Sequence, residues 1–226
     1  MIFEGALEWL LDRAHWSGQG SIPQRLLEHV GITFLVVLLA AAIAIPAGIL
    51  IGHTKRGKAA VVGLAGALRA IPSLGLLTLI GIYVGIGLSS PIITLVVLAI
   101  PSLLAGAYAG VESVDRQTVD AARAIGMSET QIIAKVELPL ALPVIVGGIR
   151  AATLQVVATA TLAAYISDYG LGRFVFSGIR GGDYSTMLGG AILVTLLAIF
   201  LEILLASIHW VSRRLAYPVR TTKGTP

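Results

Sequence analysis

The chain of 226 residues contains no cysteine, which excludes disulfide bonds and thiolate metal sites. Charge is also scarce, because Asp, Glu, Lys and Arg make up 12% of the residues, against about 25% in a soluble domain. With 56% hydrophobic residues and a mean hydropathy of +0.90, the chain has too few charges to cover a water-facing surface. The composition therefore predicts an all-α protein that crosses a lipid bilayer several times.

The sequence also lacks the residue patterns of an enzyme. Its four histidines show no metal-ligand spacing, and its apolar segments hold no nucleophile–base pair or carboxylate dyad. It has no Walker-type glycine loop followed by Lys-Ser or Lys-Thr. We expect a non-catalytic protein that holds no metal or cofactor of its own. Because Glu4, Glu8 and Asp12 interrupt the first apolar residues and no basic segment precedes them, we expect no cleaved signal peptide.

Five apolar segments are long enough to cross a membrane as helices, which takes about 20 residues. The second contains Arg69 and Pro72. Because proline removes a backbone donor and clashes with the preceding turn, we expect this span to bend or break near Ile71 and Pro72. The five predicted spans are residues 30–52, 59–88, 91–110, 142–166 and 187–211.

The basic residues are distributed unequally between the two sides that five spans define. Ten lie on one side: Lys55, Arg56, Lys58, Arg116, Arg123, Lys135, Arg213, Arg214, Arg220 and Lys223. Four lie on the other side: Arg13, Arg25, Arg173 and Arg180. Since cytoplasmic loops carry the excess of Lys and Arg, the first side is predicted to be cytoplasmic. The net charge of +4 thus reflects topology, and we expect no nucleic-acid partner.

This topology divides a single transmembrane domain, residues 1–226, into spans and flanking segments. Residues 1–28 would lie outside, where apolar residues at helical spacing predict a short helix on the membrane surface, with Trp9 and Trp16 as anchors. A packing collar without a specific role is the simpler interpretation of that helix. The tail, residues 212–226, would lie in the cytoplasm.

One stretch, DAARAIGMSETQIIAKVELPLALP (residues 120–143), is unusually polar for this chain. Asp115 can cap a helix that ends at Gly126, where glycine suits a left-handed C-terminal cap. Ser128 and Gln131 form a capping-box pattern that starts a second helix, which Pro139 would end. The cytoplasmic segment 113–141 is thus predicted to be a helix, a glycine corner and a helix. It could either brace the bundle or present a docking surface to a soluble partner.

The spacing within this segment resembles the coupling motif of permeases of ATP-binding-cassette (ABC) importers, in which two alanines and a glycine precede Leu-Pro. Aspartate stands for the usual glutamate at its start, and valine for the usual isoleucine before Leu-Pro. The motif falls on Asp120, Ala121, Ala122, Gly126, Val136, Leu138 and Pro139.

The resemblance extends to the rest of the chain and is nearest to the osmoprotectant branch, which carries glycine betaine, carnitine or choline. The segments that carry it are LLEHVGITFLVVLLAAAIAIPAGILIGH, LRAIPSLGLL, GIGLSSPIITLVVLAIPSLLAGAYAGVESVD and ATATLAAYISDYGLGRFVFSGI. Residues 167–169 depart from the glycine- and alanine-rich form expected of the branch.

The resemblance implies the MetI-like fold and a set of partners in a bacterial cytoplasmic (inner) membrane. These are ABC ATPase subunits, an extracellular or periplasmic substrate-binding protein and a second permease subunit, identical or not. ATP and Mg²⁺ would be bound by the ATPase, which would grip the cytoplasmic helix pair. Another small solute, such as an amino acid, is an alternative cargo. A secondary transporter or channel that needs no ATPase is the alternative from another class, although no internal repeat supports it.

Polar residues within the spans are candidates for a pathway or gate. Arg69 is an intramembrane charge, which is costly and by default suggests a function, but pairing with Glu202 would explain it structurally and is the interpretation we prefer. Arg150 lies nearer a span end, where it can snorkel. Gln155 could line a pathway in a span rich in small residues that favour close packing. The full set of pathway or gate candidates is Arg69, Pro72, Ser73, Gln155, Tyr165 and Glu202.

The segment 167–185 is predicted to be an external loop whose glycines allow tight turns. Its aromatic residues could form a cage for a quaternary ammonium ion. The resemblance instead places that cage in the separate binding protein, which would dock on this loop. The docking candidates are Tyr169, Arg173, Phe174, Phe176 and Tyr184.

Overall fold

The computed structural model describes residues 2–216, apart from the side chains of Val62, Arg69, Leu215 and Ala216. Across these residues all regular structure is helical, which confirms the all-α prediction. Helices long and apolar enough to cross a membrane contain α2 (Ile22–Thr54), α5 (Ser89–Glu112), α8 (Leu138–Ala160) and α11 (Tyr184–Ala216). A fifth crossing is added if α3 (Lys58–Ala70) and α4 (Ser73–Val84) count as one bent span. The predicted tail residues Arg220 and Lys223 lie outside the described residues.

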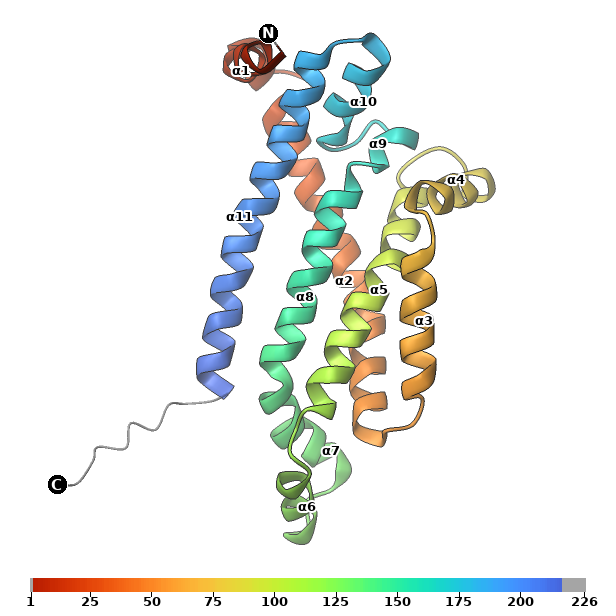
Figure 1. The fold of residues 1–226 in the computed structure, drawn as a ribbon, viewed down its shortest axis with the longest axis vertical. Coiled ribbons are helices and arrows are strands. Elements are labelled where there is room, and N and C mark those ends of the chain that lie inside the picture. The colour runs from red at the N-terminus through yellow and green to blue at the C-terminus, as the bar shows by residue number, and fades with distance from the viewer. Residues whose placement is uncertain (1, 217–226) are drawn as a thin grey trace, which may run out of the picture.

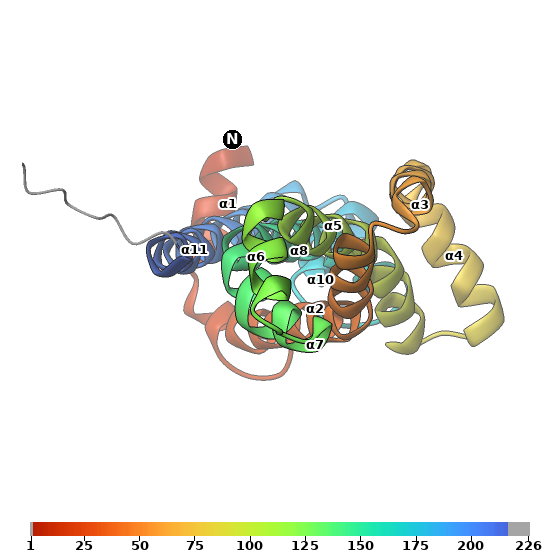
Figure 2. The same cartoon turned by 90° about the horizontal axis from the view of Figure 1, so that it is seen from below.

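The second predicted span breaks where proline was expected to break it. Helix α3 ends at Ala70, Pro72 is the N-cap residue of α4, and the two helices meet at 88°. Helix α4 consequently lies across the bundle instead of continuing along it (Figure 1). Seen along the bundle, α3 and α4 stand to one side of the other helices (Figure 2).

The centre of the fold is α5, which packs most extensively against α2 and α8. Glycines at the contacts allow the backbones to approach closely. A methyl group on Gly48 of α2 would lie 2.8 Å from the carbonyl oxygen of Leu104, and one on Gly106 of α5 would lie 2.7 Å from Cα of Gly148. Gly52 and Gly110 each follow four residues later on their helices and make similarly close contacts. Small residues at this spacing are a means by which membrane helices associate.

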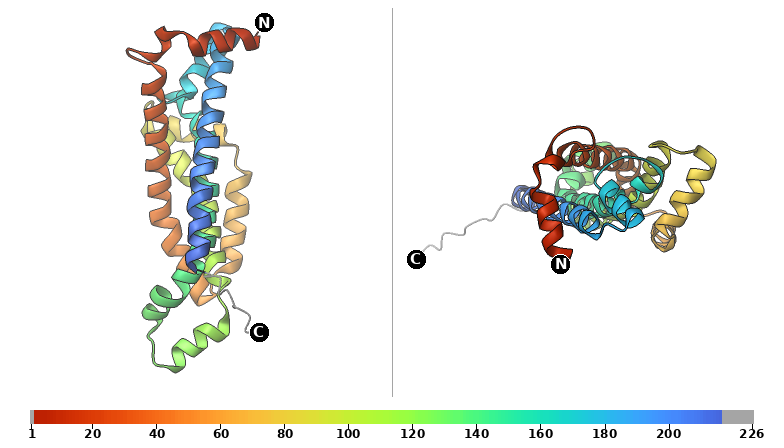
Figure 3. Two further views of the ribbon diagram at one scale, coloured as in Figure 1. Left: turned by 90° about the vertical axis from the view of Figure 1, so that its left-hand side faces the viewer. Right: turned by 90° about the horizontal axis from the view of Figure 1, so that it is seen from above.

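Shorter helices gather at the two ends of the bundle. At one end lie α1 (Ile2–Leu11), α9 (Ala163–Ile166) and α10 (Gly172–Gly181), and at the other lie α6 (Arg116–Ala124) and α7 (Glu129–Ile132), as Figures 1 and 3 show. Helix α1 runs across the bundle end with Phe3, Leu7 and Leu11 exposed. This orientation fits the predicted helix on a membrane surface.

The segment 167–185, expected to be a loop, contains the ten-residue helix α10, so that expectation was wrong. Gly170 and Gly182 flank the helix with φ values of +76° and +69°, as tight turns require. Glycine within the helix has a different role, because a methyl group on Gly178 would lie 2.6 Å from the backbone nitrogen of Met187. The glycine-rich composition therefore reflects close packing of α10 on α11 as well as turns.

Replacing Gly106 with valine should destabilise the bundle, because the new side chain would meet the backbone of α8. Overpacking typically costs about 1–3 kcal/mol, and a backbone neighbour yields less easily than a side chain. We expect a lower midpoint of thermal unfolding for Gly106→Val in lipid nanodiscs. Gly31→Val is the matched control, since a methyl group there has no neighbour within 4 Å. Equal midpoints for the two variants would contradict the proposed packing role.

Candidate functional site

The polar segment between α5 and α8 projects from one end of the bundle (Figure 1). Its first helix, α6, is capped by Asp115, whose carboxylate accepts a hydrogen bond from the backbone nitrogen of Gln117 at 3.0 Å. At its end, Gly126 has a φ of +88°, and the backbone nitrogens of Gly126 and Met127 donate to the carbonyls of Arg123 and Ala122. This pair of bonds is a Schellman motif and confirms the predicted glycine corner.

The second helix, α7, begins with the predicted capping box. The hydroxyl of Ser128 accepts from the backbone nitrogen of Gln131 at 3.4 Å, and the Gln131 side chain accepts from the Ser128 nitrogen at 3.0 Å. The prediction that Pro139 ends this helix was wrong. A π-helical turn, η2 (Ile133–Glu137), connects α7 to α8, and Pro139 occupies the first turn of α8. Proline is tolerated there because the π-helical turn before it already interrupts the regular hydrogen bonds to the carbonyl four residues back: the N–H of Leu138 bonds the carbonyl of Ile133.

The motif residues divide into a buried and an exposed set. Ala122 packs with Val119 and Ile132 between the two helices and holds the corner together. Ala121 is exposed, and Ile125, the C-cap residue of α6, is 80% exposed, an unusual position for a large apolar side chain. Val136 packs against the Ala122 cluster, Leu138 packs near α5, and Asp120 and Pro139 are exposed. The segment therefore has its own small core and presents an outward surface.

An ion-pair network connects the two helices of the corner. Arg123 donates to both carboxylate oxygens of Glu129, at 2.8 and 3.0 Å, and to Asp120 at 3.1 Å. Hydrogen bonding to Glu129 raises the pKa of the Arg123 guanidinium above its ordinary value, with Asp120 adding to the effect. The fork geometry of arginine suits such a two-oxygen contact. The network keeps α6 and α7 in a fixed relative orientation.

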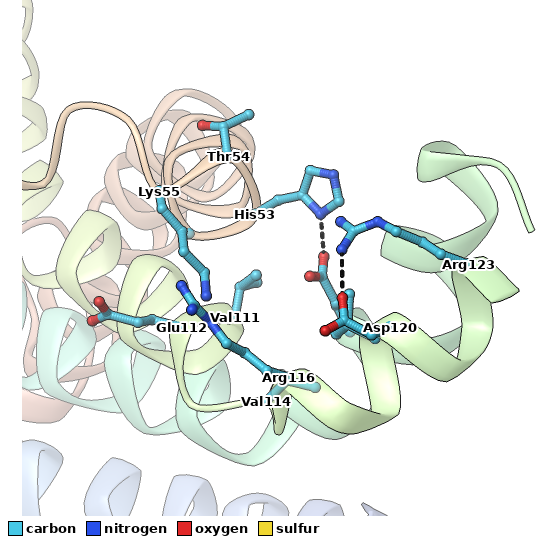
Figure 4. A pocket seen from close by; sticks show the side chains of 12 residues that line it. His53, Thr54, Lys55, Val111, Glu112, Val114, Arg116, Asp120 and Arg123 are labelled. Carbon is cyan, nitrogen blue, oxygen red and sulfur yellow. Dashed lines mark hydrogen bonds and ion pairs between the residues drawn. The ribbon is translucent and has the colours of Figure 1, made fainter.

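His53, at the end of α2, joins this network from the bundle. Its Nδ1 lies 2.7 Å from the Glu137 carboxylate and its Nε2 lies 3.1 Å from that of Glu129. Figure 4 shows His53 pointing across a polar cleft toward α6, with Asp120 and Arg123 on the far side. Sequence reasoning missed this contact, because His53 and Glu137 are 84 residues apart. The available signal was Glu137 itself, a carboxylate four residues after Ile133 on an otherwise apolar helix side.

A second polar site lies within the membrane-spanning part. Gln155 on α8 accepts a hydrogen bond from the Ser102 hydroxyl and donates one to the Leu98 carbonyl of α5, both at 2.9 Å. Ser73, at the start of α4, lines the same groove, and Pro72 precedes it. The structure thus brings Ser73 and Gln155 together, as a pathway-facing site would require. The groove residues are Leu68, Ile71, Ser73, Leu98, Ser102, Ala151, Gln155 and Thr159.

The expected pairing of Glu202 with Arg69 was wrong, because Glu202 instead pairs with Arg150. Nε of Arg150 donates to Glu202 at 2.8 Å, and the second arm of the guanidinium contacts the other carboxylate oxygen. Helices α8 and α11 pack directly on one another, whereas α3, which carries Arg69, packs on α5 away from α11 (Figures 1 and 2). The Arg69 side chain lies outside the described residues. Arg150 is therefore a paired charge and not only a topological one.

Several candidates at the opposite end have partners within the chain. The rings of Phe174 and Trp9 are in edge contact with their centroids 5.0 Å apart, and the ring centroids of Tyr165 and Phe176 are 5.6 Å apart. Tyr169 packs against the main core. Tyr165 does not line the groove of Gln155. Docking of a partner on this end stays a prediction.

A polar cluster that sequence reasoning missed closes the same end of the bundle. Arg25 on α2 donates to Glu28 at 3.0 Å and to Asp168 at 3.1 Å, and Arg173 pairs with Asp168 at 2.8 Å. The Glu28 carboxylate also accepts from the backbone nitrogen of Gly170. Arg25 had been counted only as a topological charge, and Arg173 also as a docking candidate. Their shared partner, 143 residues from Arg25, could not be found by local spacing.

Comparison with known proteins gives a consistent result. Residues 44–216 match the family described as binding-protein-dependent transport system inner membrane component. The chain is 37% identical to the carnitine transport permease protein OpuCB of Listeria monocytogenes, over 81% of this chain and 84% of that protein. It is 32% identical to the choline transport system permease protein OpuBB of Bacillus subtilis, over 83% and 86%. It is 35% identical to the osmoprotectant import permease protein OsmY of Salmonella typhimurium, over 84% and 80%.

Solved structures agree on the fold. An inward-facing conformation of the MetNI methionine ABC transporter matches with a TM-score of 0.72, at 24% identity, covering 91% of this chain and 97% of that one. At this identity the match bears on architecture alone. The predicted MetI-like arrangement is confirmed.

Arg150 and Glu202 should stabilise the fold only when both are present, because each charge destabilises it without the other. In the isolated subunit the two side chains are 31% and 35% exposed, so at membrane depth each would face lipid if left alone. We expect Arg150→Met and Glu202→Leu each to lower stability by about 2–4 kcal/mol, and the double variant to be more stable than either. Chemical denaturation in lipid bicelles measures this. Additive losses would show that the two charges do not depend on one another.

Proposed function

This chain belongs to the family of binding-protein-dependent transport system inner membrane components, and from that premise we propose how it works with its partners. It is a multi-pass, non-catalytic permease subunit of an ABC importer for osmoprotectants. The cargo class follows the relatives, whose names specify carnitine, choline and glycine betaine. ATP and Mg²⁺ would be bound by a partner ATPase.

The observation that carries the proposal is the exposed corner of α6 and α7. Its motif residues stand at one end of the bundle, and its fold is fixed by a local core and an ion-pair network. Ala121 and Ile125 form an apolar spot on an otherwise charged surface, which suits a groove in a soluble partner. We assign this surface to the ATPase subunit and place it in the cytoplasm, with the N-terminus outside, in accord with the distribution of Lys and Arg.

Transport would require two permease subunits and a binding protein. The polar groove of Gln155 and Ser73 lies on an open side of the bundle, where a second permease, identical or a sister chain, would complete a pathway. The end that carries α10 and Tyr184 would receive the binding protein. Closure of the ATPases would draw the two corners together and open the pathway outward, and hydrolysis would reset it.

Disrupting the apolar spot should weaken ATPase binding. We expect Ile125→Asp to lower the affinity of the permease for its ATPase at least about tenfold, which corresponds to roughly 1.4 kcal/mol, because a charge would enter the groove. The measurement is binding of purified ATPase to the permease in nanodiscs. Ile179→Asp on α10 is the matched control, as a 55% exposed isoleucine at the opposite end. Equal affinity of both variants for the ATPase would show that α6 is not part of the interface.

Uptake by the reconstituted complex tests the proposed activity directly. Proteoliposomes that contain the permease, its ATPase and its binding protein should accumulate radiolabelled glycine betaine, carnitine or choline only when ATP is supplied inside. Methionine should not accumulate. Uptake by the permease without the ATPase would instead favour a secondary transporter, and uptake of methionine alone would reassign the cargo.

A further inference from the structure

A single imidazole contacts both the first residue of α7 and the last residue of the π-helical turn η2, which joins the corner of α6 and α7 to α8. His53 contacts Glu129, which lies before the turn, and Glu137, which is the last residue of the turn. The two carboxylates are eight residues apart in sequence, yet both lie within 3.1 Å of the same ring. We propose that His53 is a positioning residue that splints this turn, so that α6 and α7 move as one body with α2 and α8. The inference rests on the proposed coupling function.

Without the contacts of His53, the connection between the corner and α8 would bend most easily at this turn. In a π-helical turn the N–H bonds the carbonyl five residues back, and such turns are rare and occur frequently at functional sites. Here the turn η2 is the covalent link between the corner and α8. A force applied to α6 would bend the chain at η2 unless another contact fixed the angle. His53 supplies such a contact from a different helix.

Both ring nitrogens of His53 face a carboxylate. Nδ1 is hydrogen-bonded with the Glu137 carboxylate at 2.7 Å, and Nε2 lies 3.1 Å from the Glu129 carboxylate. The side chains of His53 and Glu137 are 9% and 6% exposed, so their contact is largely shielded from water. Salt screens such a contact less than it screens one at the surface.

Charged groups from the surrounding helices balance this site. Arg123 shares Glu129 with His53, so the carboxylate links the splint to the corner network. The other ionisable side chains around the cleft are Lys55 on α2, Glu112 on α5, and Arg116 and Asp120 on α6 (Figure 4). The splint therefore fixes the corner to α2 through one side chain, within a cleft of mixed sign.

Helices α2 and α5 connect the His53 contact to the groove of Gln155. The last two turns of α2 carry Gly48 and Gly52, where the backbone lies against α5. Helix α5 in turn carries Ser102 and Leu98, which hold Gln155 in the groove. A displacement of the corner would thus be delivered both to α8, through the chain, and to α5, through His53 and α2.

The substitution that tests this removes the ring that contacts both carboxylates while keeping a polar side chain. For His53→Gln in the full complex we expect ATPase binding and hydrolysis within about twofold of the unsubstituted protein, but osmoprotectant uptake per ATP reduced by about tenfold. His53→Arg supplies a planar guanidinium whose donors can contact two carboxylates, and it should restore the ratio to within about threefold. Lys58→Gln, which breaks an exposed ion pair with Glu112 at the same end, is the control and should leave the ratio unchanged.

A distance measurement tests the splint independently of transport. Because the chain has no cysteine, Arg56→Cys and Ala134→Cys provide the only labelling sites in the subunit for a spin-label pair that spans from the end of α2 to the turn η2. In nanodiscs without ATPase, His53→Gln should broaden the distance distribution, and His53→Arg should narrow it again. An unchanged distribution would overturn the splint, even if the chain proved to bind no ATPase. A proportional fall of hydrolysis and uptake in His53→Gln would reduce His53 to a structural residue.

Discussion

The close approach of three backbones, α2 to α5 and α5 to α8, is the constraint on which the rest of this structure depends. Within a bilayer, apolar side chains gain little by leaving lipid for one another, so association relies on packing and on polar contacts. Gly48, Gly106 and Gly148 remove the side chains that would hold the helices apart. The resulting unit is narrow and leaves little room for adjustment. The corner of α6 and α7 lies between two of these helices, α5 and α8, and Gln155 lies on one of them.

Gln155 and Arg150 are partly exposed polar groups on α8, and they lie on two different sides of this unit. Gln155 sits where α5 and α8 meet, and its amide is held by groups of α5, so its position follows from the contact of Gly106 with Gly148 on the same two helices. Arg150 lies on another side of α8, where it pairs with Glu202 and fixes α11. One polar group is oriented toward a groove and the other serves assembly. Their different roles follow from the neighbours of α8, not from their chemistry.

Sequence reasoning predicted what is local and missed what depends on neighbours. The break at Pro72, the glycine corner at Gly126 and the capping box at Ser128 were found, because each is determined by a few consecutive residues. The order and approximate bounds of the apolar spans were found for the same reason. Helix α10 was missed because glycine signals a turn locally, whereas here Gly178 permits a close contact with another helix.

The misassigned ion pair illustrates the same limit. Glu202 could be matched to a basic residue by depth alone, since depth follows from position along a helix. Depth does not specify which helices are adjacent, and Arg150 was set aside as a charge near a span end. His53 was overlooked because its partners are brought together only by the return of the chain through α5, α6 and α7. The coupling motif was recognised as a whole, but the burial of Ala122 and the exposure of Ile125 became visible only in three dimensions.

The continuity of the helix through Pro139 determines how a movement of the corner is transmitted to α8. If proline had ended the helix, the corner would be joined to α8 by a flexible link, and a partner that moved α6 would transmit little force. Because η2 continues into α8, the corner and the span form one helical path with a single weak turn. Because η2 is the weak point of this path, the corner can move α8 only if another element stiffens the turn. The C-terminal end of α2, held against α5 by Gly52, is placed to do so through its last histidine.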